Sequence, residues 1–452
     1  MQYDVIIIGS GPAGYVGAVR AARHGLKTAI IEKESSLGGT CLNWGCIPTK
    51  TLLNTAKVIH TIEDAPKYGV SAGELSFDFG KIMKRKKKVV TRIVKGVEFL
   101  MKSNKIEVVR GEAAFVDPHT VNTPDGNLTS HNILIATGSV PARPPIPGLD
   151  SPHVLTSREI LDLHACPERL IIIGAGVIGM EFASFFNALG VDVTVIEMLD
   201  EILPMVDPDI TALFKRKLSK AGVTFHLSSK VTQIDGTKVL FTDASGNEQT
   251  LDTEKILLSI GVVPNTQGLE LDRVGVRTEK GAIVTDDKLR TNIPGIYAAG
   301  DVNGLWMLAH KASREAEVAA DTMAGKDVRM RYQAIPSCVY TSPEIAWVGL
   351  SEHAAKEQGK KFRVGHYDLV ANGRFLGENE GERGFVKALV GEEYGELLGL
   401  HLFAPYASEI ITVGTQGIEA ELLLADFDET VFPHPTICES VREAILSTQE
   451  AE

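Results

Sequence analysis

Cys41 and Cys46 are the residues whose type and spacing suggest chemistry most directly. They lie in the segment GGTCLNWGCIPTK, and the four residues between them are few enough for the chain to close into a small ring. The glycines of this segment allow tight turns, and Pro48 suits the first turn of a helix through TKTLLNTAKVI. A thiolate at a helix N-terminus is stabilised by the helix dipole, which lowers its pKa and raises its reactivity. The segment therefore predicts a redox-active dithiol.

Two other readings of a cysteine pair are an inert buried pair and half of a metal site. A zinc site usually needs a second Cys or His pair at ligand spacing, whereas Cys166, Cys338 and Cys438 are scattered singly. Five cysteines in 452 residues do not make a disulfide framework, and a reducing compartment would keep most of them as thiols. We therefore expect a redox pair, no metal, and three single cysteines that belong to the core.

The elements around the dithiol belong to an internal repeat. The segment YDVIIIGSGPAG at residues 3–14 returns in pattern as RLIIIGAGVIG at residues 169–179. Each is a continuous apolar run, as a strand buried on both faces requires, followed at once by G-x-G-x-x-G. In each copy a helix-like segment and a second apolar strand ending in a glutamate follow. This context predicts two βαβ dinucleotide-binding units rather than two structural glycine turns.

Six glycines and two glutamates are the candidate nucleotide-binding residues of the repeat. The glycines let the backbone approach a pyrophosphate, and the following helix N-terminus presents its free N–H groups to it. Each glutamate lies 18 positions beyond the third glycine, where it would accept hydrogen bonds from a ribose diol. The two sets align without a gap, 165 positions apart, as Gly9, Gly11, Gly14 and Glu32 and as Gly174, Gly176, Gly179 and Glu197.

Glu197 also bears on the choice of cofactor. A carboxylate at this position disfavours a 2′-phosphate, and no arginine follows closely in EMLDEILPMVDPD. NAD is therefore expected at the second unit in preference to NADP. The same reasoning suits an adenosine ribose at the first unit without deciding which dinucleotide binds there.

Further strands and a third kind of domain follow the two units. NILIATGSVPARPPIPG is predicted to be a strand and a proline-rich linker, KILLSIGVVPN closes the second unit, and GIYAAGD is a strand that ends at Gly300 and Asp301. The chain from about 334 to 452 lacks a nucleotide fingerprint. It alternates apolar runs (SCVYTS, FVKALV, LLGLHLF) with helical stretches such as SEIITVGTQGIEAELLLADF, which predicts a separate α+β domain.

Composition argues against several classes of partner. A net charge of −12 repels phosphate backbones and anionic lipid, so neither nucleic acid nor membrane is expected. The one basic run, Lys84 to Lys88, is then predicted to be a solvated helix face rather than a phosphate site. No apolar stretch approaches the roughly 20 residues of a membrane-spanning helix, and a strand-like segment follows Met1 in place of a signal peptide. A cytoplasmic protein is the simplest expectation.

Taken together, the motifs resemble those of the flavoprotein disulfide reductases, and most closely the dihydrolipoamide dehydrogenases. The resemblance covers essentially the whole chain, in the family's order: GSGPAG, GGTCLNWGCIPTK, ATGS, GAGVIGMEFA, EILPMVDPD, AAGD, MLAHKA, YTSPEIAWVG and HPTICES. It implies an α/β fold with two Rossmann-like domains of the glutathione reductase type and a C-terminal α+β dimerisation domain. The implied boundaries are 1–142 for FAD binding, 143–264 for NAD binding, 265–333 for a central domain returning to FAD, and 334–452 for dimerisation.

The resemblance also implies roles for single residues. Cys46 would be the thiol nearest the flavin, and Cys41 the thiol that exchanges with substrate. Lys50 would place its charge beside the flavin, and Glu181 would pair with Lys50. Asp301 would hold the ribityl and pyrophosphate portion of FAD. Further cofactor-lining positions are carried over from the ATGS, GVVPN and MLAHKA segments, namely Thr137, Gly138, Gly261, Met307 and Ala309, whereas His310 is expected to be structural.

His434 and Glu439 reproduce the family's base and its orienting carboxylate, five residues apart across HPTICE. A histidine near neutral pKa can remove the proton of a substrate thiol, and the glutamate would fix its orientation and stabilise the imidazolium. In the family this pair reaches the disulfide of the other subunit of a homodimer. The chain departs from the usual His-Ala-His-Pro-Thr, because Phe432 and Pro433 precede His434, and GVVPN replaces the more usual Gly-Arg-x-Pro-Asn. The first departure reshapes the predicted substrate channel.

The implied activity is NAD-dependent oxidation of a protein-bound dihydrolipoyl group through the dithiol and FAD. The lipoyl protein would belong to a 2-oxoacid dehydrogenase, acetoin or glycine cleavage complex. One alternative is an NAD(P)H-dependent reductase of a different disulfide, such as glutathione. Mercuric reductase usually carries an extra C-terminal cysteine pair, which the tail SVREAILSTQEAE lacks. An alternative of another class is a non-catalytic, NAD-responsive redox sensor or scaffold.

Overall fold

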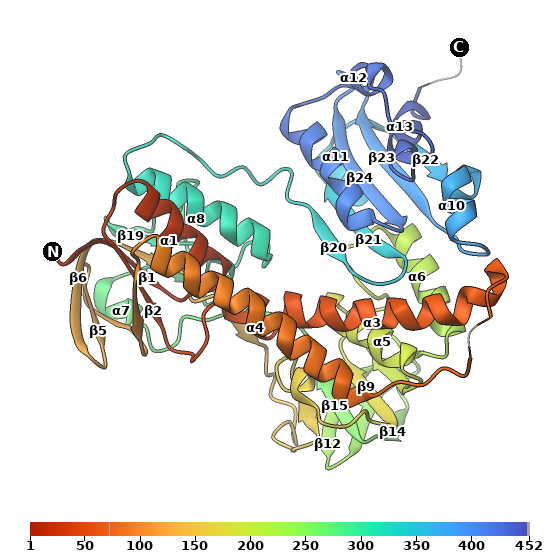
Figure 1. Cartoon of the computed structure of the whole chain (residues 1–452), viewed down its shortest axis with the longest axis horizontal. Coiled ribbons are helices and arrows are strands. Elements are labelled where there is room, and N and C mark those ends of the chain that lie inside the picture. The colour runs from red at the N-terminus through yellow and green to blue at the C-terminus, as the bar shows by residue number, and fades with distance from the viewer. Residues whose placement is uncertain (72, 450–452) are drawn as a thin grey trace.

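The first predicted unit forms a seven-stranded sheet in the order β3-β2-β1-β6-β5-β4, with β19 paired to β6 (Figure 1). The computed structural model describes residues 1–71 and 73–449 of the chain. Its parallel strands are β1 (Tyr3–Ile8), β2 (Thr28–Glu32), β3 (Glu107–Arg110), β6 (Gly126–Ile135) and β19 (Ile296–Ala298). β4 (Ala114–Asp117) and β5 (Thr120–Thr123) extend β6 in antiparallel fashion. Because β19 pairs with β6, the chain returns to this sheet after the second unit.

The second unit is a five-stranded parallel sheet in the order β11-β10-β9-β15-β8. Its strands are β8 (Val154–Leu155), β9 (Arg169–Ile173), β10 (Asp192–Ile196), β11 (Thr224–His226) and β15 (Lys255–Leu258). A meander of β12 (Lys230–Asp235), β13 (Lys238–Thr242) and β14 (Glu248–Asp252) adjoins it. The two units are joined by β7 (Ser139–Pro141), which pairs with β16 (Val262–Pro264). The apolar runs of both copies are buried, as predicted for strands covered on both faces.

Each sheet is covered by helices that follow its strands. α1 (Pro12–Arg23) packs against α8 (Ala309–Met323) beside the first sheet, and α5 (Val177–Ala188) and α6 (Pro208–Lys220) belong to the second unit (Figure 1). The short elements α7 (Leu271–Val274), β17 (Thr278–Glu279) and β18 (Ala282–Ile283) precede β19. The α/β architecture predicted from the repeat is confirmed, and the proposed domain boundaries remain predictions.

Three helices surround the dithiol segment. α2 (Gly39–Asn43) carries Cys41, the predicted helix is α3 (Cys46–Asp64), and α4 (Phe79–Ser103) packs against both (Figure 1).

The prediction that the basic run Lys84 to Lys88 on α4 forms a solvated helix face is wrong for Lys86. That side chain is buried and its ammonium donates to the Leu161 carbonyl, because it points inward among four exposed basic neighbours.

The C-terminal domain is a five-stranded antiparallel sheet in the order β20-β21-β24-β23-β22. The strands are β20 (Ser337–Val339), β21 (Glu344–Gly349), β22 (Phe362–Asp368), β23 (Phe385–Gly391) and β24 (Leu397–Ala404). Its helices are α9 (Glu352–Glu357), α10 (Gly373–Glu378), α11 (Ala407–Glu419), α12 (Leu424–Glu429) and α13 (Glu439–Leu446). The stretch SEIITVGTQGIEAELLLADF is two helices rather than one, because Glu421 has a φ of 55° and ends the first. Among the described residues, no helix has the length and apolarity to cross a membrane.

The three single cysteines lie at the edges of cores rather than inside them. Cys166 packs against the core of the second unit, and Cys338 and Cys438 pack against the core of the C-terminal domain. All three are only partly buried. The expectation that they belong to the core therefore holds in part, and Cys338 also lines the large cavity described next.

Candidate functional site

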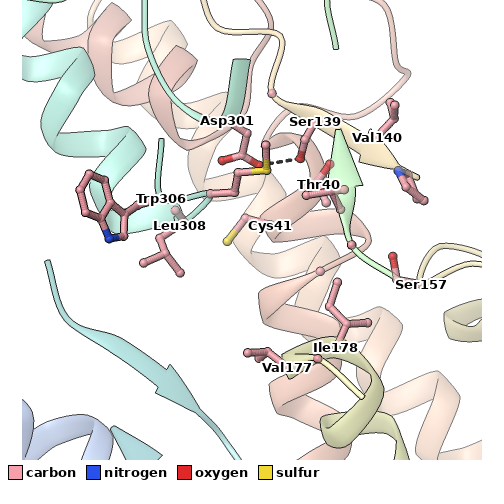
Figure 2. A pocket seen from close by; sticks show the side chains of 18 of the residues that line it. Thr40, Cys41, Ser139, Val140, Ser157, Val177, Ile178, Asp301, Trp306 and Leu308 are labelled. Atoms are coloured by element: carbon pink, nitrogen blue, oxygen red, sulfur yellow. Dashed lines mark hydrogen bonds between the residues drawn. The ribbon is translucent and has the colours of Figure 1, made fainter. Parts of the chain in front are cut away.

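One cavity of about 2350 Å³ contacts both glycine-rich loops and the dithiol. Its volume is more than twice the upper end of the roughly 300–1,000 Å³ typical of a single small-molecule site. Figure 2 shows Cys41 within it, with Val177 and Ile178 from the start of α5 facing the same space. Every predicted cofactor-binding residue except the third glycine of each loop lines this cavity: Gly9, Gly11, Glu32, Lys50, Thr137, Gly138, Gly174, Gly176, Glu181, Glu197, Gly261, Asp301, Met307 and Ala309.

The two glycine-rich loops have the same backbone geometry. The first glycine of each has positive φ, 98° at Gly9 and 104° at Gly174, which a side chain rarely adopts. A Cβ on the third glycine would meet the carbonyl oxygen of the first, at 1.9 Å for Gly14 and 2.2 Å for Gly179. These third glycines therefore pack helix against strand rather than facing the cavity.

The second glycine of each loop stands at the start of a helix and leaves room beside it. A Cβ on Gly176 would meet no heavy atom within 4 Å, and one on Gly11 only the Cα of Gly39 at 3.9 Å. Gly11 and Gly176 are the N-caps of α1 and α5, and no described side chain caps either helix. The first amide groups of both helices are thus free of side-chain partners, as a phosphate-binding helix N-terminus requires.

The two glutamates that close the units are held in the same way. Glu32 accepts hydrogen bonds from the amides of Ser10 at 2.9 Å and Glu34 at 2.8 Å. Glu197 accepts them from the amides of Ala175 at 2.6 Å and Leu199 at 2.9 Å. The duplication seen in the sequence therefore extends to individual hydrogen bonds, and each carboxylate is oriented at the edge of its loop.

Cys41 and Cys46 face each other from two consecutive helices. Cys46 is the first residue of α3, and no described side chain caps that helix. A hydrogen bond from the Cys41 thiol is the largest influence on Cys46 and, with the Lys50 charge, lowers the pKa of Cys46 to about 7, although burial opposes this. The same hydrogen bond, together with burial, raises the pKa of Cys41. Of the two thiols in the reduced pair, Cys46 therefore ionises first.

Lys50 and Glu181 form an ion pair next to the thiols. The Lys50 ammonium lies 2.9 and 2.8 Å from the two carboxylate oxygens of Glu181, which comes from α5 of the second unit. Glu181 is almost fully buried and also accepts the Tyr340 amide at 3.1 Å. The Lys50 ammonium lies 4.6 Å from the centre of the Tyr340 ring. The pair thus joins the dithiol helix, the second unit and the C-terminal domain at one point.

Asp301 lies beside the linker strand β7, and a buried network of hydrogen bonds holds the residue before it in place. Its carboxylate accepts a hydrogen bond of 2.6 Å from the Ser139 hydroxyl (Figure 2). The preceding amide, of Gly300, donates to Glu315 at 2.7 Å. Glu315 also pairs with Lys311 at 3.1 Å, and both side chains are fully buried. This network holds the AAGD turn in place at the cavity wall.

His434 and Glu439 interact as predicted but lie outside this cavity. His434 Nδ1 and Glu439 Oε2 are 2.9 Å apart, and Glu439 also accepts the Thr436 amide at 3.0 Å. Burial would raise the pKa of Glu439, but the hydrogen bonds from His434 and Thr436 outweigh it and lower the pKa. The His434 side chain is 78% exposed and does not line the cavity with Cys41. One chain therefore does not bring the predicted base to the dithiol.

Several residues of the site were not singled out in the sequence. Ser139 and Tyr340 lie inside the quoted motifs ATGS and YTSPEIAWVG, but no spacing pointed to them. Arg158 stacks on Trp44 at 3.9 Å and pairs with Glu34 at 3.0 Å, next to the dithiol segment. Lys311 and Glu315 occupy an i, i+4 spacing on α8, which would have suggested a surface ion pair rather than a buried one.

Comparison with known proteins places this geometry in a family context. Residues 3–316 match the pyridine nucleotide-disulphide oxidoreductase family, and residues 335–445 match the dimerisation domain of that family. The chain is 39% identical to a dihydrolipoyl dehydrogenase of Rhizobium etli, over 98% of each protein. It is 41% identical to a dihydrolipoyl dehydrogenase of Chlorobaculum tepidum, over 100% of this chain and 98% of the relative.

A solved structure is similar over the same length. The HOCl-induced flavoprotein disulfide reductase RclA of Escherichia coli superposes with a TM-score of 0.88 and is 29% identical in sequence. The match covers 99% of this chain and 100% of the other.

Proposed function

Because the chain belongs to the pyridine nucleotide-disulphide oxidoreductase family, we propose that it oxidises protein-bound dihydrolipoamide to lipoamide and reduces NAD. The observation that carries this proposal is the position of Cys41 and Cys46 in one cavity with two glycine-rich loops. Its relatives over the full length include dihydrolipoyl dehydrogenases of different bacteria. The chain is therefore an oxidoreductase, with FAD and NAD as its cofactors.

The residues present fit both cofactors. The uncapped starts of α1 and α5 suit two pyrophosphates, and the open space beside Gly11 and Gly176 lets a phosphate approach the backbone. Glu32 and Glu197, whose carboxylates are oriented by backbone amides, would accept hydrogen bonds from the ribose of each nucleotide. Asp301, Met307 and Ala309 would line the FAD site, and the carboxylate of Glu197 favours NAD over NADP.

The two cysteines have distinct roles in the thiol–disulfide exchange with the substrate. In the oxidised enzyme, a substrate thiolate attacks the sulfur of Cys41, so that a mixed disulfide forms and the Cys41–Cys46 bond breaks. Cys46 leaves as a thiolate, which its pKa of about 7 makes a good leaving group. The second substrate thiol then attacks the mixed disulfide, forms the lipoyl disulfide and releases Cys41, which takes up a proton. The substrate has lost two electrons and two protons.

FAD, when bound, would supply two-electron redox chemistry between the dithiol and NAD. Lys50 holds a positive charge near Cys46 and keeps the thiolate ionised. Glu181, buried on α5 of the second unit, orients Lys50 through two hydrogen bonds.

His434 would complete the site across a homodimer. The match to the dimerisation domain indicates a homodimeric enzyme, and a lipoyl-bearing protein is its substrate. In our proposal, His434 of the partner subunit removes the proton of the substrate thiol, and Glu439 holds the imidazole through its Nδ1. The host assembly would be a 2-oxoacid dehydrogenase, acetoin or glycine cleavage complex.

A steady-state assay with dihydrolipoamide and NAD tests the proposal. Turnover with NAD, and little with NADP, is expected of protein that carries FAD. Absence of turnover in protein shown to hold FAD would rule out the lipoamide assignment. Cys46→Ser should abolish turnover while the yellow colour and the fold survive, whereas a redox sensor or scaffold would keep its function.

One alternative substrate has specific support. The similarity to RclA, a disulfide reductase by name, and the Phe432-Pro433 pair ahead of His434 are compatible with a different disulfide. In that case NADH-dependent reduction of another disulfide would exceed dihydrolipoamide oxidation under matched conditions.

A further inference from the structure

Lys387, on β23 of the C-terminal domain, makes its ionic contacts with residues distant in the chain. Its ammonium lies 3.0 and 3.1 Å from the two carboxylate oxygens of Asp207 and 2.9 Å from Glu352, and it also pairs with Asp209. The side chains of Lys387 and Asp207 are only 4% and 2% exposed. Burial would lower the pKa of Lys387, but the three carboxylates raise it, so the lysine stays charged. A buried charge held by three carboxylates is not a chance surface contact.

Asp207 follows a loop that lines the cavity next to the second glycine-rich turn. It is the N-cap of α6, where its carboxylate accepts the Asp209 amide at 3.0 Å. The loop before it, residues 198–206, contributes Met198, Leu199, Pro204 and Met205 to the cavity wall. Asp207 is therefore the anchor at the far end of a cavity-lining loop that starts at Glu197.

The same loop is tied to the second glycine-rich turn. The Leu203 amide donates to the Ala175 carbonyl at 3.0 Å, and the Ala175 amide donates to Glu197 at 2.6 Å. Leu203 has a φ of 47° and is fully buried, so its position tolerates little adjustment. Hydrogen bonds therefore join Glu197 to Ala175 and Ala175 to Leu203, and the chain leads from Leu203 within four residues to Asp207, which pairs with Lys387.

α6 belongs to the second unit and packs against the C-terminal domain. Figure 1 shows it beside the C-terminal sheet. The Phe214 ring on α6 lies 6.4 Å from that of Phe403 on β24, and Lys217 pairs with Glu382 at 2.5 Å. On β24, directly across from Lys387, His401 is buried and its Nδ1 has no hydrogen-bond partner among the described residues. Phe214 and Lys217 contact the C-terminal domain from the middle and the end of α6, whereas Lys387 contacts its N-terminus at Asp207.

We propose that Lys387 is a positioning residue for the second nucleotide: by holding Asp207, the C-terminal domain fixes loop 198–206 against the second glycine-rich turn and thereby sets the affinity for NAD. The inference rests on the proposed function for the identity of the nucleotide. It assigns to the dimerisation domain a role in NAD binding besides dimerisation.

The test compares variants that separate position from stability. Lys387→Met alone would leave the buried carboxylate of Asp207 unpaired and could prevent folding. The double variant Lys387→Met with Asp207→Asn removes both charges, and asparagine still caps α6. Lys217→Met is the matched control, because it removes an ion pair between α6 and Glu382 of the C-terminal domain and leaves Asp207 and Lys387 unchanged.

Three measurements are made on the FAD-loaded protein: the dissociation constant of NAD by calorimetry, the rate of flavin reduction by dihydrolipoamide without NAD, and the melting temperature. The double variant should weaken NAD binding roughly tenfold, since residues along such a contact chain shift coupling by up to that order. Its rate of flavin reduction should match wild type, and Lys217→Met should leave both quantities within about twofold.

Two results would overturn the proposal: a folded double variant that binds NAD like wild type, or one that loses NAD affinity and dithiol-driven flavin reduction to the same extent. If the wild-type protein binds NAD but does not oxidise dihydrolipoamide, the proposed function fails while the calorimetric test of Lys387 remains valid.

Discussion

At the scale of single residues, the reactivity of the dithiol depends on charge placed by two different parts of the chain. Cys46 begins α3, and Lys50 lies one helical turn further along the same helix. Glu181 reaches that lysine from α5 and would otherwise be a buried, unpaired carboxylate. The helix therefore supplies the dipole and the cation, and the second unit supplies the group that holds the cation in place.

Lys50→Met should raise the pKa of Cys46 in the reduced protein, because the ammonium is one of the influences that favour its thiolate, after the hydrogen bond from Cys41. In wild type, the ultraviolet absorbance of the thiolate should appear with a midpoint near pH 7. The midpoint should move to higher pH in Lys50→Met and stay close to wild type in Lys50→Arg. An unchanged midpoint in Lys50→Met would show that the helix and Cys41 suffice.

At the scale of elements, the two βαβ units use the same loop for two separable purposes. The third glycine of each loop has carbonyl oxygen where a side chain would go, and the second glycine has open space. Packing of the loop and access for the nucleotide thus depend on different positions. α1 is further joined to α8 by Asp321, which binds both Arg20 and His24.

Gly176→Ala and Gly179→Ala should therefore fail in different ways. Gly176 has a φ of −75°, which alanine adopts freely, and its Cβ would contact nothing, so the fold should survive while NAD binding weakens at least tenfold. In Gly179→Ala the new Cβ would lie 2.2 Å from the Gly174 carbonyl, so the melting temperature should fall markedly. Calorimetry with NAD and thermal melting distinguish the two; equal loss of stability in both variants would contradict the assignment.

Asp321→Asn should weaken the junction of α1 and α8 by roughly 1–3 kcal/mol, the usual cost of losing a charged hydrogen-bond partner. The pKa of Asp321 is lowered mainly by its hydrogen bond from Arg20, so the folded state holds its proton more weakly than the unfolded chain does. Its stabilising contribution is therefore complete above the ordinary carboxyl pKa near 4 and is lost as the pH falls below that value. Chemical denaturation at several pH values should show a smaller acid-induced loss of stability in the variant than in wild type.

At the scale of the whole molecule, one chain holds the dithiol and both glycine-rich loops in one cavity, whereas His434, the base in our proposal, lies outside it. His434 is exposed on the C-terminal domain, and the dimerisation-domain match extends over that region. An exposed histidine already oriented by a carboxylate fits a site that two subunits complete together.

Mixing two inactive variants tests this arrangement. Cys46→Ser and His434→Gln should each lose dihydrolipoamide oxidation as homodimers. After dissociation and reassociation of an equal mixture, half of the dimers contain one of each chain, and one of their two sites is intact. Activity should then recover to about a quarter of wild type for a two-fold symmetric dimer. No recovery, despite exchange of subunits shown by mass spectrometry, would mean that His434 serves its own chain.

Much of the fold and part of the site follow from local sequence. Continuous apolar runs ending in glycine predict buried parallel strands, because every residue of such a strand faces a core. The repeat of the pattern from Gly9 to Glu32 indicates two nucleotide-binding units. The cysteine pair is recognisable from its own segment. By contrast, the local sequence does not mark where α11 ends, because the left-handed conformation that follows this helix is adopted by Glu421 and not by a glycine.

The remaining features were decided by tertiary structure. Lys50 meets Glu181, Asp301 meets Ser139, and Lys387 meets Asp207, each across more than 100 residues of chain. Periodicity records which face of an element is buried, but not which other element covers it, since that depends on how whole units are oriented against each other. For this reason Lys387 and His401, both inside apolar strand runs, carry no signal in the sequence. The sequence by itself determined the two nucleotide units and the dithiol, and the packing of domains decided which charges surround them.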